Sequence, residues 1–264
     1  MQNHASTLAA EFKLDAARVA ATVALIDEGN TIPFIARYRK EATGSMDDQT
    51  LRALDERLSY LRKLDDQKET VHNSITEQGA MTPEIAAALE KAKTLAEVED
   101  IYRPYKPKRK TRASIARARG LEPLAARLLE QRPEDEPALL ARQYITEEVP
   151  DTEAALAGAR DILAEGFSDS ANLRATLRSL YNATALVESK AAKKDTDSVY
   201  SGYYDYSEPA AKMAGHRILA VDRGEREGFL KVSVTVDAAR AVRLLTERTV
   251  KNDSPSAEQV RAAA

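Results

Sequence analysis

DDQTLRALDERLSYLRKLDDQKETVHNSITEQ, residues 47–78, is a long stretch with apolar residues at helical spacing. Its apolar positions recur every three or four residues and are Leu51, Leu54, Leu58, Leu61, Leu64, Val71 and Ile75. Residues spaced in this way share one face of an α-helix. The pattern predicts a helix from Asp47 or Asp48 to about Gln78, whose leucine face is the seam of a helical hairpin or bundle. A partner-binding coiled coil is the alternative, although the repeat falters after Leu64.

The composition of the whole chain is also that of packed helices. Ala, Leu, Glu and Arg are frequent, aromatic residues make up 5% of the 264 residues, and Trp is absent. These proportions are typical of helices rather than of a β-sandwich. A chain of this length forms one large domain or two modest ones, with a core that needs no covalent cross-links. Because Cys is absent, disulfides and thiolate metal sites are excluded.

Shorter helices are expected on both sides of residues 47–78. Capping residues, prolines in first turns and glycine stops place their ends. The expected ranges are about 5–12, 15–27, 31–41, 83–92, 94–103, 114–119, 122–130, 136–145, 152–165, 170–182 and 238–246. One more helix is expected to begin at Ser254.

A β signal follows residue 182. Residues 183–190 have an extended character, residues 216–221 alternate, and residues 229–236 place three apolar side chains on one face. We interpret residues 222–225 as a turn between two strands. The predicted fold class is therefore mainly α, a multi-helical bundle with a small β-hairpin near residues 216–236.

Positive charge is concentrated in one segment of a chain whose formal net charge is -3. Residues 101–120 contain no Asp or Glu, and their cations are Arg103, Lys106, Lys108, Arg109, Lys110, Arg112, Arg117 and Arg119. Pro104 and Pro107 exclude regular helix, so we expect an extended basic loop. With Tyr102 and Tyr105 interleaved, the loop is suited to contact phosphates and stack a base. Docking against acidic helices of the same chain, near Glu97, is the open alternative.

A second candidate surface surrounds Arg37, Arg39 and Lys40. Phe34 and Tyr38 lie one helical turn apart beside these cations. The same residues also fit a structural role, in which Phe34 and its neighbour bury and the cations pair with nearby acids. A tyrosine cluster at residues 200–206 has the same two interpretations, a stacking platform or a packed junction.

Motifs of catalysis are absent from the sequence. His4, His72 and His216 are scattered and lack metal-ligand spacing. No Gly-rich phosphate loop or nucleophile motif occurs, so we expect no enzyme activity, no cofactor and no small-molecule substrate. The first thirty residues lack the features of a signal peptide, and no apolar run approaches the ~20 residues of a membrane span. A soluble, cytoplasmic protein without a membrane partner is expected.

Three stretches together resemble the Tex family of bacterial transcription accessory proteins. The first is residues 31–41, TIPFIARYRKE, followed by Thr43-Gly44. The second is residues 100–113, DIYRPYKPKRKTRA, with ARGLEPL at 118–124. The third is YDYSE at 204–208, then His216-Arg217 and RGEREG at 223–228. Their order and spacing make the resemblance specific, and they span nearly the whole chain.

The resemblance implies a domain organisation. It implies an N-terminal helical region with a helix-turn-helix-like part, assigned here to residues 1–198. Residues 199–264 are then the start of a central core. Full-length members continue into a ribonuclease H-like domain, helix-hairpin-helix modules and an S1 RNA-binding domain, so we expect this chain to end inside a larger architecture.

The expected function is a nucleic-acid-associated transcription accessory module that binds RNA or DNA without sequence preference. The candidate binding residues of the basic loop are Arg103, Tyr105, Lys106, Lys108, Arg109, Lys110 and Arg112, and those of the second surface are Arg37, Arg39 and Lys40. The transcription machinery is a further expected partner. The alternative is a non-catalytic scaffold that positions downstream RNA-binding domains.

Overall fold

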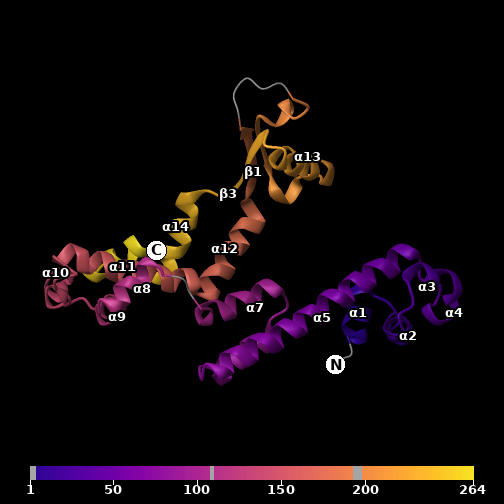
Figure 1. The fold of residues 1–264 in the computed structure, drawn as a ribbon, viewed down its shortest axis with the longest axis horizontal. Coiled ribbons are helices and arrows are strands. Elements are labelled where there is room, and N and C mark those ends of the chain that lie inside the picture. The colour runs from indigo at the N-terminus through magenta and orange to yellow at the C-terminus, as the bar shows by residue number, and fades with distance from the viewer. Residues whose placement is uncertain (1–3, 108–109, 193–197) are drawn as a thin grey trace. The chain divides into compact units, whose positions relative to one another are not determined.

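The computed structural model describes residues 4–107, 110–192 and 198–264. These residues form two compact units, Met1–Tyr102 and Arg103–Ala264, which Figure 1 draws as a mainly helical chain with one small sheet. The predicted mainly α fold class is confirmed. The domain division at residues 198 and 199 and the helix-turn-helix-like part stay predictions.

The first unit is built on one long helix. Its elements are α1 (Ala5–Phe12), α2 (Ala16–Asp27), α3 (Ile32–Tyr38), α4 (Lys40–Thr43), α5 (Asp48–Glu77), α6 (Pro83–Lys91) and α7 (Leu95–Tyr102). The side chain of Asp47 accepts a hydrogen bond from the backbone N–H of Thr50 at 2.6 Å, so Asp47 is the cap and α5 begins at Asp48.

The leucine face of α5 is buried as predicted. All seven apolar positions of this face are 7% exposed or less. Leu54, Leu58 and Leu61 share a core with Leu8 of α1 and Val19 of α2. The stripe is therefore the seam of an intramolecular bundle, because burial of these side chains removes apolar surface from water.

The segment expected as one helix at residues 31–41 is two short helices. Arg39 has φ -123° and ψ 28°, outside the helical region, and this residue separates α3 from α4. Ile35 is fully buried and is the one buried side chain of α3. The helix is anchored at this point, and Phe34, Arg37 and Tyr38 are exposed.

The second unit has its core around α11. Its helices are α8 (Arg112–Ala118), α9 (Glu122–Glu130), α10 (Pro137–Ala141), α11 (Thr152–Asp169), α12 (Ala171–Thr184), α13 (Gly215–Arg226), α14 (Ala238–Thr249) and α15 (Pro255–Ala263), with 3-10 turns η1 (Arg103–Tyr105), η2 (Arg142–Tyr144), η3 (Ser201–Tyr203) and η4 (Ala210–Lys212). Leu124, Leu128, Ala155, Ile162 and Val260 meet in this core. The C-terminal helix α15 therefore packs beside α9 and α11 (Figure 1).

Gln131 fixes the end of α14. Its side chain is 1% exposed, and its amide nitrogen donates to the carbonyl oxygen of Thr249 at 2.9 Å. Its side-chain oxygen accepts from the backbone N–H of Lys251 at 2.8 Å. Because unpaired polar groups in a core are costly, these bonds hold the end of α14 against α9.

The sheet is three-stranded and antiparallel, in the order β2 (Asp205–Pro209), β1 (Leu186–Ala191), β3 (Leu230–Thr235). The strand within 229–236 is confirmed, and the extended character of residues 183–190 is confirmed from residue 185 on, since residues 183 and 184 belong to α12. The strand expected at 216–221 and the turn at 222–225 are wrong, since both lie within α13. Val221 and Gly224 are the buried positions of α13. They lie three residues apart, so a helix buries both on one face, whereas a strand would place them on opposite faces. β3 pairs with β1 instead.

A carboxylate joins β2 to α13. Glu208 accepts a hydrogen bond from the hydroxyl of Tyr206 and two from the guanidinium of Arg217, at 2.9 and 2.6 Å. The Tyr206 hydroxyl, and then Arg217, hold the pKa of Glu208 below its ordinary value of 4.5. These contacts favour the charged form of the carboxyl in the folded protein.

Glu208→Gln is expected to lower stability at neutral pH and to remove part of the acid sensitivity. A group with a depressed folded pKa contributes stability above its unfolded pKa, and this contribution is lost as pH falls through the folded value. The difference in melting temperature between wild type and E208Q should therefore shrink as pH falls below about 4.5. Glu188→Gln, on the opposite face of the sheet, is the control. A difference that grows on acidification would contradict this account.

None of the helices in the described residues is long and apolar enough to cross a bilayer.

Candidate nucleic-acid interface

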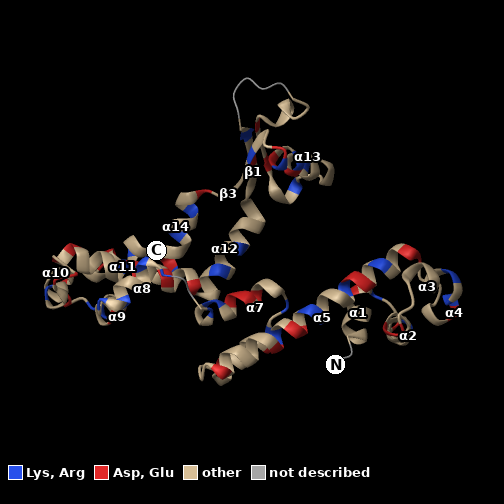
Figure 2. Ribbon diagram, in the orientation of Figure 1, with Lys and Arg blue, Asp and Glu red and all other residues tan. Residues whose placement is uncertain are grey.

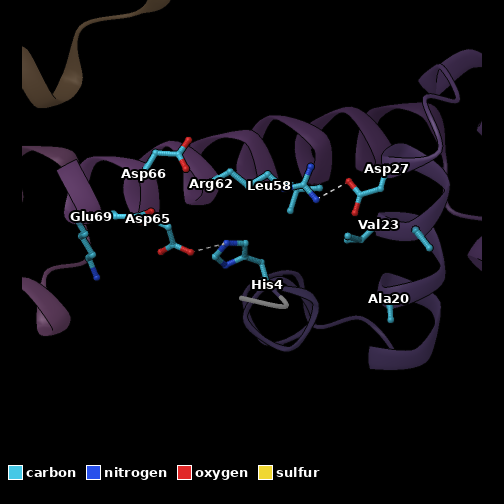
Figure 3. Close-up of a pocket in the computed structure, with 11 residues that line it drawn as sticks. His4, Ala20, Val23, Asp27, Leu58, Arg62, Asp65, Asp66 and Glu69 are labelled. Carbon is cyan, nitrogen blue, oxygen red and sulfur yellow. Dashed lines mark hydrogen bonds and ion pairs between the residues drawn. The ribbon is translucent and has the colours of Figure 1, made fainter. Parts of the chain in front are cut away.

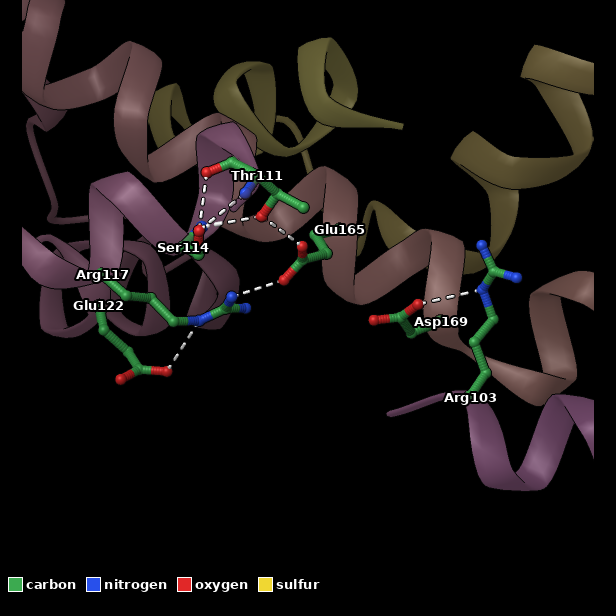
Figure 4. Close-up of polar contacts among 7 residues, drawn as sticks. All are labelled: Arg103, Thr111, Ser114, Arg117, Glu122, Glu165 and Asp169. Carbon is green, nitrogen blue, oxygen red and sulfur yellow. Dashed lines mark hydrogen bonds and ion pairs between the residues drawn. The ribbon is translucent and has the colours of Figure 1, made fainter. Parts of the chain in front are cut away.

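Two arginines of the basic segment, residues 101–120, are held by carboxylates of α11. Nε of Arg103 lies 3.1 Å from Oδ1 of Asp169, and Nη1 of Arg117 lies 2.5 Å from Oε2 of Glu165 (Figure 4). The side chains of Asp169 and Glu165 are only 12% and 13% exposed. Glu165 raises the pKa of Arg117 through this hydrogen bond. These two cations serve intramolecular docking, the alternative that the sequence left open.

The start of α8 is tied to the same carboxylate. Thr111 caps the helix by accepting from the backbone N–H of Ser114 at 3.0 Å, and its hydroxyl donates to Oε1 of Glu165 at 2.9 Å (Figure 4). Ser114 completes a capping box by accepting from the backbone N–H of Thr111. The sequence did not indicate Glu165 or Asp169 as partners, because they lie 48 to 66 residues away from the side chains that they contact.

Two further cations of the basic segment, Arg112 and Lys110, are more exposed. Arg112 is 86% exposed, with its Nε 3.5 Å from Asp161, and Lys110 is exposed. Lys106 and Tyr105 are half-buried, and Lys108 and Arg109 lie outside the described residues. Arg103–Tyr105 forms a 3-10 turn rather than extended chain, because the fixed φ of proline is compatible with that turn.

Glu165→Gln tests this docking. The change removes the nearer of two carboxylates that face Arg117, the other being Glu122 at 3.4 Å. We expect it to lower the free energy of unfolding by about 1–2 kcal/mol, discounted for the partial exposure of Arg117. Urea unfolding measures the effect. Glu153→Gln, which alters an exposed ion pair with Arg160 on the same helix, is the matched control. Equal stabilities of the two variants would show that Glu165 does not anchor the basic segment.

The second candidate lies on α3 and α4, and we name it the α3–α4 surface: Phe34, Arg37, Tyr38, Arg39 and Lys40. All five residues are exposed, Phe34 by 38% and Tyr38 by 65%. The two rings lie 5.2 Å apart between centroids. Cζ of Arg39 is 6.0 Å from the Phe34 ring, and Cζ of Arg37 is 6.0 Å from the Tyr38 ring.

The structural role expected for these residues is only half right. Ile35 is buried, whereas Phe34 stays exposed because Ile35 takes the inward position of α3. Within the part of the chain that the structure describes, Arg37, Arg39 and Lys40 form no ion pair with a carboxylate. Figure 2 shows Lys and Arg in blue near α4. An exposed aromatic pair with unneutralised cations is suited to stack a base and contact phosphates.

A groove of about 880 Å³ on the first unit has a different character. Among its lining residues are the acids Asp27, Asp65, Asp66 and Glu69 (Figure 3). Nε2 of His4 lies 3.1 Å from Oδ2 of Asp65, and Nη2 of Arg62 lies 2.6 Å from Oδ1 of Asp27. Lys68, which also lines the groove, donates to the backbone carbonyl oxygen of Glu90 at 2.9 Å. The four acids outnumber the two cations Arg62 and Lys68, so the groove repels a polyanion.

Tyr200 of the tyrosine cluster packs inside the second unit, whereas Tyr203, Tyr204 and Tyr206 are half-buried. Tyr200 is 6% exposed, and its hydroxyl donates to Glu227 at 2.8 Å. Tyr203 and Tyr206 meet edge to face with centroids 5.1 Å apart. Of the two interpretations of residues 200–206, packing fits Tyr200, whose ring is buried and has no face available for a base.

Comparison with known proteins extends over most of the chain. Residues 2–76 match the Tex-like protein N-terminal domain, and residues 132–264 match the Tex central region-like family. The chain is 47% identical over 235 residues to Protein tex of Bordetella pertussis, covering 88% of this chain and 30% of that protein. It is 45% identical over 229 residues to Transcriptional accessory protein Tex of Neisseria gonorrhoeae, covering 86% of this chain and 30% of that protein.

A human protein matches at lower identity. S1 RNA-binding domain-containing protein 1 of Homo sapiens is 32% identical over 230 residues, covering 81% of this chain and 22% of that protein. The chain thus spans about a third or less of the length of these relatives. Since the central-region match alone covers half of the chain and the N-terminal match adds a further part, the chain belongs to the Tex family of transcription accessory proteins.

Proposed function

We propose that this chain is a non-catalytic, nucleic-acid-binding part of a transcription accessory protein, and that it holds RNA or DNA by the phosphate backbone without reading sequence. The names of its relatives describe a transcriptional accessory protein and an S1 RNA-binding domain-containing protein. The observation that carries the proposal is the α3–α4 surface, where three cations and two aromatic rings are exposed together.

Cations without carboxylate partners are the ones that a polyanion can use. A side chain that already faces a carboxylate loses that attraction when it turns to a phosphate, so Arg103 and Arg117 gain little from binding. Arg37, Arg39 and Lys40 lose no such partner within the described residues. Their contact with phosphates releases the counterions condensed on the nucleic acid, which favours binding irrespective of sequence.

The basic segment has a secondary part in this proposal. Lys110 and Arg112 are exposed and add to the positive field, whereas Arg103 and Arg117 hold η1 and α8 against α11. Of the two candidate surfaces indicated by the sequence, we therefore propose the α3–α4 surface as the main binding site and the basic segment as an auxiliary one.

Fluorescence anisotropy over a range of salt concentrations tests the proposal. The three cations alone predict a slope of log affinity against log salt of at least about 2 in magnitude for single-stranded RNA, at roughly 0.7 per phosphate contact. Oligonucleotides of unrelated sequence should bind alike. Binding no tighter than that of a neutral helical protein of similar size would overturn the proposal.

A scaffold role is the second candidate, and one observation favours it. Ile218 and Leu219 of α13 are 49% and 69% exposed, and neighbouring exposed apolar side chains are a feature of protein-docking surfaces. If the chain fails to bind nucleic acid, a role in positioning other domains or docking to the transcription machinery becomes the better account.

A further inference from the structure

A second cationic site lies in a groove between α12 and α14. The groove has a volume of about 420 Å³, and its lining residues are Ala175, Thr176, Ser179, Leu180, Ala183, Arg240, Leu244 and Arg248. The lining, as far as the structure describes it, contains two arginines and no Asp or Glu. We propose that this groove binds the phosphodiester backbone of a single nucleic-acid strand. The proposal rests on the proposed function for the identity of its ligand.

The two arginines lie on one stripe of α14. Arg240, Leu244 and Arg248 follow each other at intervals of four residues, so they project toward the same side of the helix. Eight residues of α-helix span about 12 Å. The groove therefore has positive charge near both ends, with the apolar side chain of Leu244 between.

Neither arginine is neutralised by the fold. Within the described residues, Arg240 and Arg248 form no ion pair, in contrast to Arg103 and Arg117. Helix α12 contains no acidic residue, and Glu247 is the one acid of α14. Figure 2 shows Lys and Arg on both helices. The groove is thus locally positive in a chain whose net charge is -3.

The remaining wall of the groove suits the sugars and bases of a strand. The hydroxyls of Thr176 and Ser179 donate to carbonyl oxygens of their own helix, each at 3.0 Å. They are therefore already used as donors, and contact with phosphate falls to the arginines. Leu180, Ala183 and Leu244 supply an apolar surface. Contact of this surface with the apolar face of a sugar or base removes apolar area from water, which favours binding.

Helix α14 is capped at its start and tied to another element at its end, so the groove is formed before a ligand arrives. Asp237 caps its start by accepting from the backbone N–H groups of Ala239 and Arg240, at 2.9 and 3.2 Å. Gln131 holds its end through Thr249. A preformed site loses less conformational freedom on binding.

The separation of the arginines decides which phosphate ligand fits. A single phosphate ion would require both arginine side chains to converge from helix positions about 12 Å apart, whereas a chain of phosphates can contact each arginine separately. An open groove with cations at intervals and an apolar floor matches the general features of single-strand binding sites.

The test compares R240E/R248E with R243E on the full 264-residue chain. Arg243 is one residue from Leu244, so it lies about 100° around α14 and outside the groove. The probe is a fluorescein-labelled oligouridine of about 15 nucleotides, within the range that small single-strand sites cover. Circular dichroism and melting temperature confirm that each variant folds.

We expect R240E/R248E to weaken oligouridine binding roughly tenfold or more and to lower the salt slope by about 0.7 per arginine. R243E reverses one charge. Per reversed charge, it should change the binding free energy by less than half as much as R240E/R248E does. If the wild type binds and R240E/R248E has the slope of R243E, the groove is excluded while the proposed function stands. If the wild type does not bind, both are overturned.

Competition distinguishes other sources of negative charge. Pyrophosphate and oligoglutamate are titrated against the bound oligouridine, with chloride at matched ionic strength as the reference. We expect neither to displace the strand better than chloride does. Displacement by pyrophosphate or oligoglutamate that R240E/R248E abolishes would assign the groove to a small anion or an acidic peptide instead.

Discussion

Replacing Arg37, Arg39 and Lys40 together by glutamate is expected to weaken binding of single-stranded RNA about 100-fold at low salt. Each residue is exposed and lacks a carboxylate partner within the described residues, so each contributes its full charge to phosphate contact. Reversal removes three attractions and introduces three repulsions. Equilibrium anisotropy with labelled oligouridine measures the change.

K63E/K91E/K93E is the matched control. These three lysines are exposed on the same unit but lie outside the α3–α4 surface. The control has the same net charge as R37E/R39E/K40E, so it separates a local site from a general effect of charge. Equal losses in the two triple variants would mean that the α3–α4 surface is no specific site.

Removing both rings of the α3–α4 surface is expected to weaken binding about tenfold or more without altering the salt slope. Stacking of a base on an aromatic side chain contributes roughly 1–3 kcal/mol and does not release counterions. The variant is F34A/Y38A, measured by the same anisotropy titration at several salt concentrations. The loss should be similar for different base sequences, since every base has a face that stacks.

F34Y/Y38F keeps both rings and is expected to restore binding to near the wild-type level. Ile35, which anchors α3 in the core, is unchanged in both variants, so the helix should persist. A loss in F34Y/Y38F equal to that in F34A/Y38A would mean that the hydroxyl position or local packing matters, and stacking would not explain the effect.

The fold could be predicted where burial follows from a local period. Seven apolar positions over residues 47–78 recur at helical spacing, and α5 buries all of them. Residues 216–221 were predicted as a strand because their apolar and polar residues alternate. A run of six residues is too short to exclude a helix, and the buried pair Val221 and Gly224 has the three-residue spacing of a helix face. The partner of β3 is β1, some forty residues earlier, and the sequence pattern alone does not specify such a pairing.

The candidate site was harder to predict because a cation is available to bind phosphate only if no carboxylate of the fold already faces it. The sequence shows that Arg103 and Arg117 belong to a basic segment, but their carboxylates come from α11, 66 and 48 residues away. The groove of Arg240 and Arg248 was missed, since its other wall, α12, is distant in sequence. An indication was present in two arginines eight residues apart and in the acid-free stretch 171–184.

The salt dependence of wild type and R37E/R39E/K40E, measured side by side on oligouridine, tests the central claim most directly. If these three side chains contact phosphates, the slope of log affinity against log salt falls in magnitude by about 2 in the variant. If the two slopes are equal while both proteins are folded, the α3–α4 surface does not contact the nucleic-acid backbone.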